Sequence, residues 1–214
     1  STPLYSSAAS DVYKRQDSVS VSGSDVDGDQ LTFSITGGTD ITASLSGTDV
    51  TFGAPENYNG SEDFTVSVTD GEYTDSQSIT VTVNAVNDAP TANAATGATD
   101  EDQSTVIALS GDDIDGDNLT FVLTADAVNG SVTLDGSLAT YTPSADFNGN
   151  DSFTFSVTDG QYSSTADVTV SVAAVNDAPV LAAVADVSFD EDGSGSVSVS
   201  GSDVDGDQLT FSIT

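Results

Sequence analysis

The sequence repeats itself with a period of about 89 residues, and this repetition limits how the chain can fold. The run Val-Asn-Asp-Ala-Pro at residues 86–90 returns at residues 175–179, and residues 18–36 are identical to residues 196–214. Such repetition indicates a structural unit that is copied along the chain. We expect a partial repeat at 17–86 that lacks its first strand, a complete repeat at 87–175, and a truncated repeat at 176–214.

Residues 1–16 stand outside this repeat and contain Lys14 and Arg15, the chain's two basic residues. One back-translation of this segment resembles an adapter used in sequencing libraries. We therefore interpret residues 1–16 as a translated cloning or sequencing scar and leave them out of the fold prediction. The rest of the chain then has no lysine or arginine, which excludes lysine Schiff-base chemistry and arginine clamps.

Alternating apolar and polar residues in the complete repeat predict seven short β-strands. Asp-Gly and Asn-Gly pairs separate most of these runs. The strands are expected at 91–99, 104–110, 118–124, 130–134, 137–141, 152–158 and 163–173. The side chains expected to face inward are Ile107, Leu109, Leu119, Phe121, Leu123, Val132, Tyr141, Phe153, Phe155, Val157, Val168, Val170 and Val172. Seven strands at this spacing, without a helical segment, predict a two-sheet β-sandwich of immunoglobulin type.

An acidic loop, Asp-x-Asp-Gly-Asp, follows the second strand of each repeat. Its carboxylates repel one another at this spacing, and a hard divalent cation with oxygen ligands would remove that repulsion. Ca²⁺ is the predicted ion, and a solvated turn is the alternative interpretation. An EF-hand is excluded because Thr36 stands where the bidentate glutamate would be needed. The candidate ligands in these loops are Asp25 and Asp27, then Asp113, Asp115 and Asp117, then Asp203 and Asp205.

The order of the strands assigns each acidic motif to one end of the sandwich. The first strand delivers Glu101 to the end where the sixth strand begins, near Asp151. The second and sixth strands deliver Asp113 and Asp159 to the opposite end. Acidic groups of consecutive repeats should therefore face one another across each linker, and we predict cation sites between repeats.

The composition excludes several classes of function. The 214 residues carry a formal net charge of −33, which disfavours binding to nucleic acid and insertion into anionic membranes. The absence of histidine and cysteine excludes tetrahedral zinc sites, iron–sulfur clusters and Ser-His or Cys-His nucleophile pairs. Paired carboxylates could suggest a glycosidase, but these groups lie at domain ends rather than in a cleft. We therefore predict that the chain is not an enzyme.

The Asn-Asp-Ala-Pro linkers, the glutamate ending the first strand, Asp-x-Asp after the second and Asp-Gly after the sixth resemble cadherin repeats. More closely, residues 17–214 resemble the bacterial cadherin-like tandem repeats of large secreted, calcium-dependent (RTX-type) adhesins. This resemblance implies an all-β chain of tandem immunoglobulin/cadherin-like seven-stranded Greek-key β-sandwiches. It implies a first calcium junction with Asn87, Asp88, Asp113, Asp115 and Asp159, joined by Glu62 or Asp63. It implies a second with Glu101, Asp151, Asn176, Asp177, Asp203 and Asp205.

The predicted function is a non-catalytic, calcium-binding extender of a bacterial surface or secreted adhesin, made rigid by calcium between its domains. Its expected location is extracellular or on the bacterial surface. Its expected partners are calcium and neighbouring repeats, with a glycan or cell-surface receptor bound elsewhere in the parent protein. Two alternatives stay open: a module that binds a ligand or another copy of itself, and accessory repeats of a secreted polysaccharide-active enzyme.

Overall fold

The computed structural model describes residues 16–213, which form β-strands and no helix. Among these residues there is accordingly no helix long and apolar enough to cross a membrane. The chain divides into two compact units, residues 1–87 and residues 88–214. Apart from Gln16, the segment interpreted as a scar lies outside the described residues.

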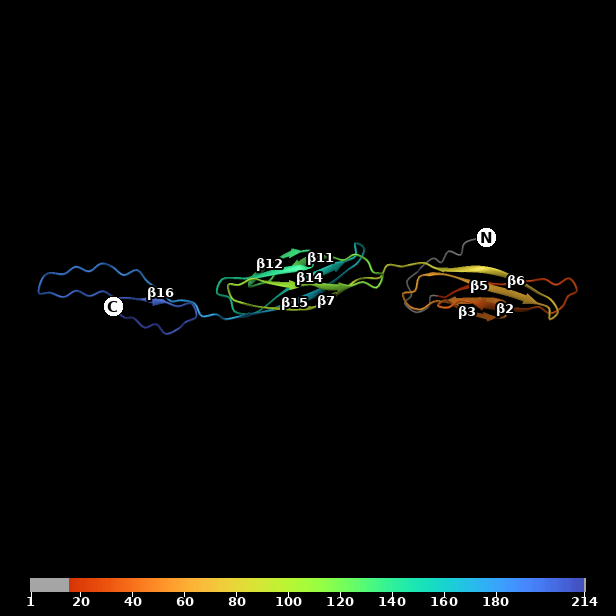
Figure 1. Ribbon diagram of the computed structural model, residues 1–214, viewed down its shortest axis with the longest axis horizontal. Coiled ribbons are helices and arrows are strands. Elements are labelled where there is room, and N and C mark those ends of the chain that lie inside the picture. The colour runs from red at the N-terminus through yellow and green to blue at the C-terminus, as the bar shows by residue number, and fades with distance from the viewer. Residues whose placement is uncertain (1–15, 214) are drawn as a thin grey trace. The chain divides into compact units, whose positions relative to one another are not determined.

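The first unit is a sandwich of two three-stranded sheets, ordered β1-β4-β3 and β2-β5-β6 (Figure 1). Its small core consists of Ile41, Val50, Phe52 and Phe64, and the two phenylalanine rings meet edge to face at 5.2 Å. Its strands are β1 (Gln16–Ser20), β2 (Thr32–Gly37), β3 (Thr42–Ser46), β4 (Asp49–Gly53), β5 (Gly60–Thr69) and β6 (Thr74–Val83).

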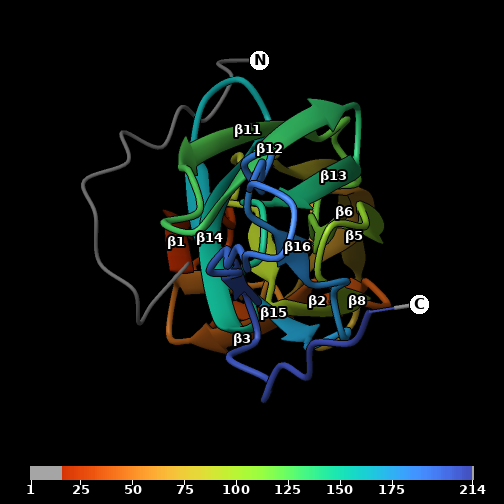
Figure 2. The same ribbon diagram turned by 90° about the vertical axis from the view of Figure 1, so that its left-hand side faces the viewer.

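The second unit is a sandwich of a four-stranded sheet, ordered β11-β14-β15-β8, and a three-stranded sheet, ordered β12-β13-β9. The chain passes between these two sheets four times, as in a Greek key, and Figure 2 shows β12 and β13 opposite β15. Its strands are β7 (Thr91–Asn93), β8 (Ala95–Asp100), β9 (Thr105–Ala108), β10 (Ser110–Asp112), β11 (Thr120–Ala125), β12 (Gly130–Asp135), β13 (Leu138–Pro143), β14 (Gly149–Thr158), β15 (Ser163–Ala173), β16 (Val180–Leu181) and β17 (Gly201–Ser202).

The core of the second unit contains every side chain that the sequence placed inside the complete repeat. Leu119, Phe121 and Leu123 are partly buried and the others are buried, because they occupy every second position along the strands or next to a strand end. Ala139 is also buried, although it was not predicted. The all-β prediction and the sandwich architecture are thus confirmed.

The first two predicted strands of the complete repeat differ from the structure, because each is divided into two. Within 91–99, β7 pairs antiparallel with β10, whereas β8 pairs in parallel with β15. Within 104–110, β9 pairs with β13, and a break at Leu109 separates it from β10. The first segment therefore pairs in two different sheets, whereas β9 and β10 form one run that is interrupted at Leu109. Ala92 and Ala95 both pack against the core although they are three positions apart, so the alternation shifts between β7 and β8. The prediction of one strand at 91–99 did not include this shift.

The second unit also contains residues 176–213, in which the only strands are the short pair β16 and β17. Val180 and Leu181 of this pair occupy the place that β7 has in the preceding repeat, and Gly201 and Ser202 that of β10. Apolar side chains farther along this segment stay exposed, including Phe189 at 63% and Phe211 at 49%.

Candidate metal centres

The acidic loop has the same internal hydrogen bonds in all three repeats. Oδ1 of Asp113 accepts hydrogen bonds from the backbone N–H groups of Asp115 at 2.9 Å and Asp117 at 3.2 Å. Asp25 and Asp203 bind the corresponding amides of their own loops at 2.8–3.1 Å. Gly116 has φ of 78°, a conformation that other residues rarely adopt. The first aspartate of the loop therefore uses one carboxylate oxygen to shape the loop. In Asp113, the other carboxylate oxygen, Oδ2, is buried without a hydrogen-bond partner.

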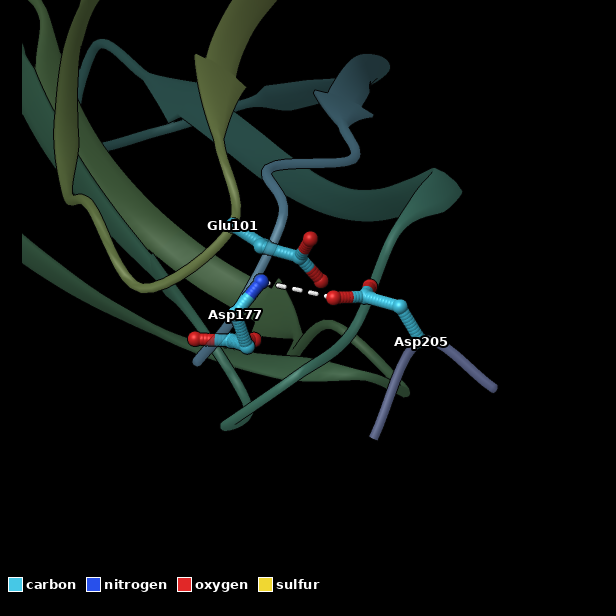
Figure 3. Close-up of side chains that lie close together, drawn as sticks. All are labelled: Glu101, Asp177 and Asp205. Atoms are coloured by element: carbon cyan, nitrogen blue, oxygen red, sulfur yellow. Dashed lines mark hydrogen bonds between the residues drawn. The ribbon is translucent and has the colours of Figure 1, made fainter. Parts of the chain in front are cut away.

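The middle aspartate of the loop holds the linker that precedes the repeat. Oδ2 of Asp115 accepts a hydrogen bond from the backbone N–H of Asp88 at 2.7 Å. In the next repeat, Oδ2 of Asp205 accepts one from the backbone N–H of Asp177 at 2.6 Å, which Figure 3 shows as a dashed line. The side chain of each linker aspartate is thereby brought beside the loop.

One acidic group lies at the end of the second unit where β10 and β14 finish. Oxygens of Asp113, Asp117 and Asp159 lie within 4.8 Å of one another. Oδ1 of Asp159 is fixed by the backbone N–H groups of Gln161 and Tyr162, both at 2.6 Å, in the turn between β14 and β15. The sequence assigned these three aspartates to the same end of the sandwich, and the structure brings them together.

A second acidic group joins the end of the complete repeat to the loop of the following one. Carboxylate oxygens of Glu101, Asp177 and Asp205 lie within 4.8 Å of one another (Figure 3). Glu101 is only 3% exposed, and its carboxylate accepts hydrogen bonds from the side chain of Asn148 at 3.3 Å and from the backbone N–H of Val175. The linker is therefore held by carboxylates from both of the repeats that it connects.

A third group shares Asp177 with the second and adds two residues that the sequence analysis did not select, Asp102 and Asp146. The backbone N–H of Asp146 donates to Asp102 Oδ1 at 3.3 Å, and both residues have positive φ, 57° and 60°. Asp146 was missed because its counterpart in the first repeat is Asn57, so comparison of the repeats gave no acidic pattern there. Asp102 could have been selected from the sequence, because it directly follows the predicted ligand Glu101.

The carboxylates around Asp177 repel one another. Burial raises the pKa of Asp177, and the negative charges of Asp146, Asp205, Asp102 and Glu101 raise it further. Asp177 Oδ2 is buried and has no hydrogen-bond partner. No basic side chain lies among residues 16–213, so none there can neutralise this charge. Clustered carboxylate oxygens without a cationic partner are the donor set that a hard divalent cation prefers.

Several predicted ligands have other contacts in the structure. Asp151 is 6% exposed, and its carboxylate accepts hydrogen bonds from the N–H groups of Val128 and Asn129 and from the hydroxyl of Tyr141. Its counterpart Glu62 binds the N–H groups of residues 39–41. Both carboxylates thus fix the loop that joins the two sheets, and we leave Asp151 and Glu62 out of the ligand set.

The other candidates lie outside the three acidic groups found among residues 16–213. Asp63 accepts a hydrogen bond from the hydroxyl of Thr80 at 2.6 Å. The side-chain amide of Asn176 donates to the carbonyl of Asp177 at 2.8 Å. The remaining candidates outside these groups are Asn87, Asp88, Asp115, Asp203, Asp25 and Asp27, of which Asp115, Asp203 and Asp25 have the loop and linker contacts described above.

Comparison with known proteins places the chain in a sequence family. A family model described as bacterial Ig domain matches residues 4–82 and residues 87–171, which together make up most of the chain. The first match begins inside the segment interpreted as a scar, whose origin stays a prediction. No curated protein matches the chain.

The solved structures that match the chain are distant in sequence. Domains EC1-2 of human protocadherin-24 are 13% identical, with a TM-score of 0.49, over 72% of this chain and 87% of that one. Drosophila N-cadherin EC1-3 is 14% identical, with a TM-score of 0.36, over 71% and 57%. The endo-fucoidan hydrolase MfFcnA4 from glycoside hydrolase family 107 is 23% identical, with a TM-score of 0.34, over 77% of this chain and 27% of that one. The chain thus spans about a quarter of that hydrolase.

Proposed function

The chain belongs to the bacterial Ig domain family, and we propose that it is a non-catalytic extender whose linkers bind calcium. Domains of this family are typically non-catalytic, and the acidic groups described above lie at domain ends. The proposed setting is a bacterial surface or secreted protein, of which these repeats form a stalk.

One observation carries the proposal: the position of Asp177 between two repeats. Its backbone N–H binds Asp205 of the following repeat, and its side chain lies with Glu101 of the preceding one. One of its oxygens is buried without a partner, and its pKa is raised by burial and by surrounding carboxylates. A divalent cation at this point would bind oxygens of the linker and of both repeats at once.

The proposed mechanism is electrostatic. Without the ion, the carboxylates of the linker region repel one another. The linker is then held by the hydrogen bonds that the backbone N–H groups of Val175 and Asp177 donate to Glu101 and Asp205. With the ion, the same carboxylates attract it from both sides, so the linker loses freedom. Repeats joined in this way would form a stiff array when every linker is loaded.

Calcium fits better than magnesium. Calcium accepts six to eight oxygen ligands in flexible geometry, whereas magnesium requires near-ideal octahedral geometry and keeps several waters. Glu101, Asp177, Asp205, Asp102 and Asp146 form two groups of carboxylates that share Asp177, and together they offer more oxygens than a hydrated magnesium ion requires. Extracellular modules of this kind bind calcium at about 0.1–1 mM, so the linkers would be loaded outside the cell.

Isothermal titration of calcium into the metal-free full chain tests this proposal. We expect saturable binding, and Asp177→Asn should weaken it by about tenfold or more at one class of sites. Asp135→Asn is the matched control, because Asp135 is the last residue of β12, is exposed and belongs to none of the acidic groups. Equal calcium affinity in both variants would refute a site at Asp177.

A further inference from the structure

The chain contains three asparagines that are followed directly by glycine, in the pairs Asn59-Gly60, Asn129-Gly130 and Asn148-Gly149. In such a pair the backbone nitrogen of the glycine attacks the side-chain amide of the asparagine, because glycine has no Cβ to hinder the approach. The five-membered imide that forms releases ammonia, which makes these pairs prone to deamidation. A strand ladder slows this reaction where it holds the N–H of the glycine in a hydrogen bond. The fold therefore decides which of the three pairs reacts first.

Two of the three glycines, Gly60 and Gly149, are held in a ladder. Gly149 pairs with Val172 in the ladder of β14 and β15. At the other end of that ladder the N–H of Asp159 donates to the carbonyl of Tyr162. Hydrogen-bonded and open pairs alternate along an antiparallel ladder, and Gly149 lies an even number of positions from Asp159, so its N–H is hydrogen-bonded. Gly60 lies 89 positions earlier, at the same place in the ladder of β5 and β6, so its N–H is held in the same way.

The third glycine, Gly130, has its N–H outside the ladder. It stands opposite Pro143 on β13, and one position along, the N–H of Ser144 donates to the carbonyl of Asn129 at 2.8 Å. By the same alternation the pair of Gly130 is open, so its N–H points away from β13. In the described part of the chain β12 is the outer strand of its sheet, so no further strand accepts this N–H. The nitrogen of Gly130 is thus available to the side chain of Asn129, which is partly buried in the bend before β12.

The packing of β12 requires glycine at the position after Asn129. A Cβ built on Gly130 would lie 2.6 Å from Cε2 of Tyr141 and 2.7 Å from the carbonyl oxygen of Thr142. The ring of Tyr141 is fully buried, so it has no room to move away from a side chain at this point. The reactive pair is therefore a consequence of how β12 packs on β13.

Conversion of Asn129 would act on a buried contact. The backbone N–H of Asn129 donates to Asp151 Oδ2 at 2.8 Å, and the buried carboxylate of Asp151 holds the loop between β11 and β12. An aspartate at position 129 brings a second negative charge to this carboxylate. An isoaspartate adds one methylene to the backbone before Gly130, where the ring of Tyr141 leaves no space. Both products therefore weaken the hold of Asp151 on the loop.

We propose that Asn129 is a site of spontaneous deamidation, that it reacts ahead of Asn59 and Asn148, and that its conversion releases the β11–β12 loop. The nitrogen of Gly130 gives up its proton and forms a bond to Cγ of Asn129. The bond between Cγ and Nδ2 breaks, and ammonia leaves with that proton. Water then opens the imide at one of its two carbonyls, which gives aspartate or isoaspartate. The reaction needs no cation and is independent of the proposed calcium sites.

Peptide mapping by mass spectrometry tests the order of reaction. The full chain is incubated at mildly alkaline pH, either in native buffer with calcium or in urea, and is cut with chymotrypsin, since residues 17–214 contain no lysine or arginine. In native buffer we expect Asn129 to convert about fivefold faster than Asn59 and Asn148, the factor that corresponds to one net hydrogen bond. In urea the three should convert at similar rates, because the ladders are lost. Equal rates in native buffer would overturn the proposal.

Amide hydrogen exchange of the Asn129→Asp chain tests the effect on the loop. The N–H of Val128 donates to Asp151 Oδ1 at 3.2 Å, so it reports on the hold of Asp151. We expect it to exchange about tenfold faster in this variant, as for the loss of a hydrogen bond to a charged group. Asn150→Asp is the matched control, because the exposed Asn150 lies next to Asp151 on β14 and its side chain points to the opposite face. Unchanged exchange of Val128 in Asn129→Asp would show that conversion does not release the loop.

Discussion

At the scale of single residues, both units contain a hydrogen bond from a tyrosine hydroxyl to a carboxylate, but the tyrosine lies at a different position in each unit. Asp151 accepts a hydrogen bond from Tyr141, and its counterpart Glu62 accepts one from Tyr58. The tyrosine and phenylalanine exchange places between the repeats, since Phe52 corresponds to Tyr141 and Phe147 to Tyr58. Glu62 accepts its hydrogen bond from Tyr58 in the β4–β5 loop, whereas Asp151 accepts one from Tyr141 on β13, so the acid is the common element.

Replacing Tyr141 by phenylalanine should isolate the energy of this contact. Phe52 shows that the position accepts the ring, while the variant removes a hydroxyl that bonds Asp151 at 3.1 Å. Burial and Asp151 raise the pKa of Tyr141 to about 12, which indicates that the hydroxyl stays protonated and donates. We expect urea denaturation to show a loss of about 1.5–3 kcal/mol, as for a hydrogen bond to a charged group. A change no larger than that of Thr133→Ser, on the exposed face of β12, would contradict this role.

The first unit should lose local order in acid. Hydrogen bonds from the backbone N–H groups of Asp40, Thr39 and Ile41 hold the pKa of Glu62 below its ordinary value. A carboxyl with a lowered folded-state pKa stabilises the fold above the unfolded-state pKa, about 4.3 for glutamate, and this stabilisation is lost as pH falls through the folded value.

Amide hydrogen exchange measures this effect directly. Protection factors of Asp40 and Ile41 should fall as pH is lowered through the acid range, whereas Glu62→Gln should have lower protection throughout and a weaker pH dependence. Protection that does not change with pH in the natural sequence would show that the carboxylate does not hold this loop.

At the scale of secondary structure, the sequence predicted the core because alternation on paired strands decides which side chains face inward. It did not predict that the first two strands are each divided, because β7 and β8 pair with different strands and the inward positions shift between Ala92 and Ala95. The acidic ends were assigned correctly from strand direction, as the grouping of Asp113 with Asp159 shows. Asp146 was not predicted, because its position depends on a left-handed turn that only the folded backbone reveals.

The packing of β8 against β9 predicts a compensating pair of substitutions. Gly97→Ala should destabilise the second unit by about 1–3 kcal/mol, because its Cβ would lie 2.4 Å from the end of the Ile107 side chain. Ile107→Val shortens that side chain and should restore part of the loss in the double variant. A double-mutant cycle measured by chemical denaturation gives the coupling between the two. Strictly additive effects would show that the two side chains do not compete for space.

At the scale of the whole molecule, the dominant property is an uncompensated negative charge. With 35 acidic and two basic residues, the folded chain concentrates charge that the unfolded chain can spread out. The melting temperature in chelator should therefore rise with sodium chloride between about 10 and 300 mM, over which the screening length falls from about 30 Å to well below 10 Å. A melting temperature independent of salt would show that charge repulsion does not limit stability.

The central claim is that calcium at the linkers joins the repeats, and thermal melting of the full chain in chelator and in millimolar calcium tests it most directly. Calcium at ten times its dissociation constant should stabilise each site by about 1.4 kcal/mol and raise the melting temperature by about 5–10 °C. Asp113→Asn combined with Asp177→Asn should remove most of this rise, and Asp135→Asn should not. A melting temperature that is the same in chelator and in calcium would contradict the claim and leave the acidic loops as solvated turns.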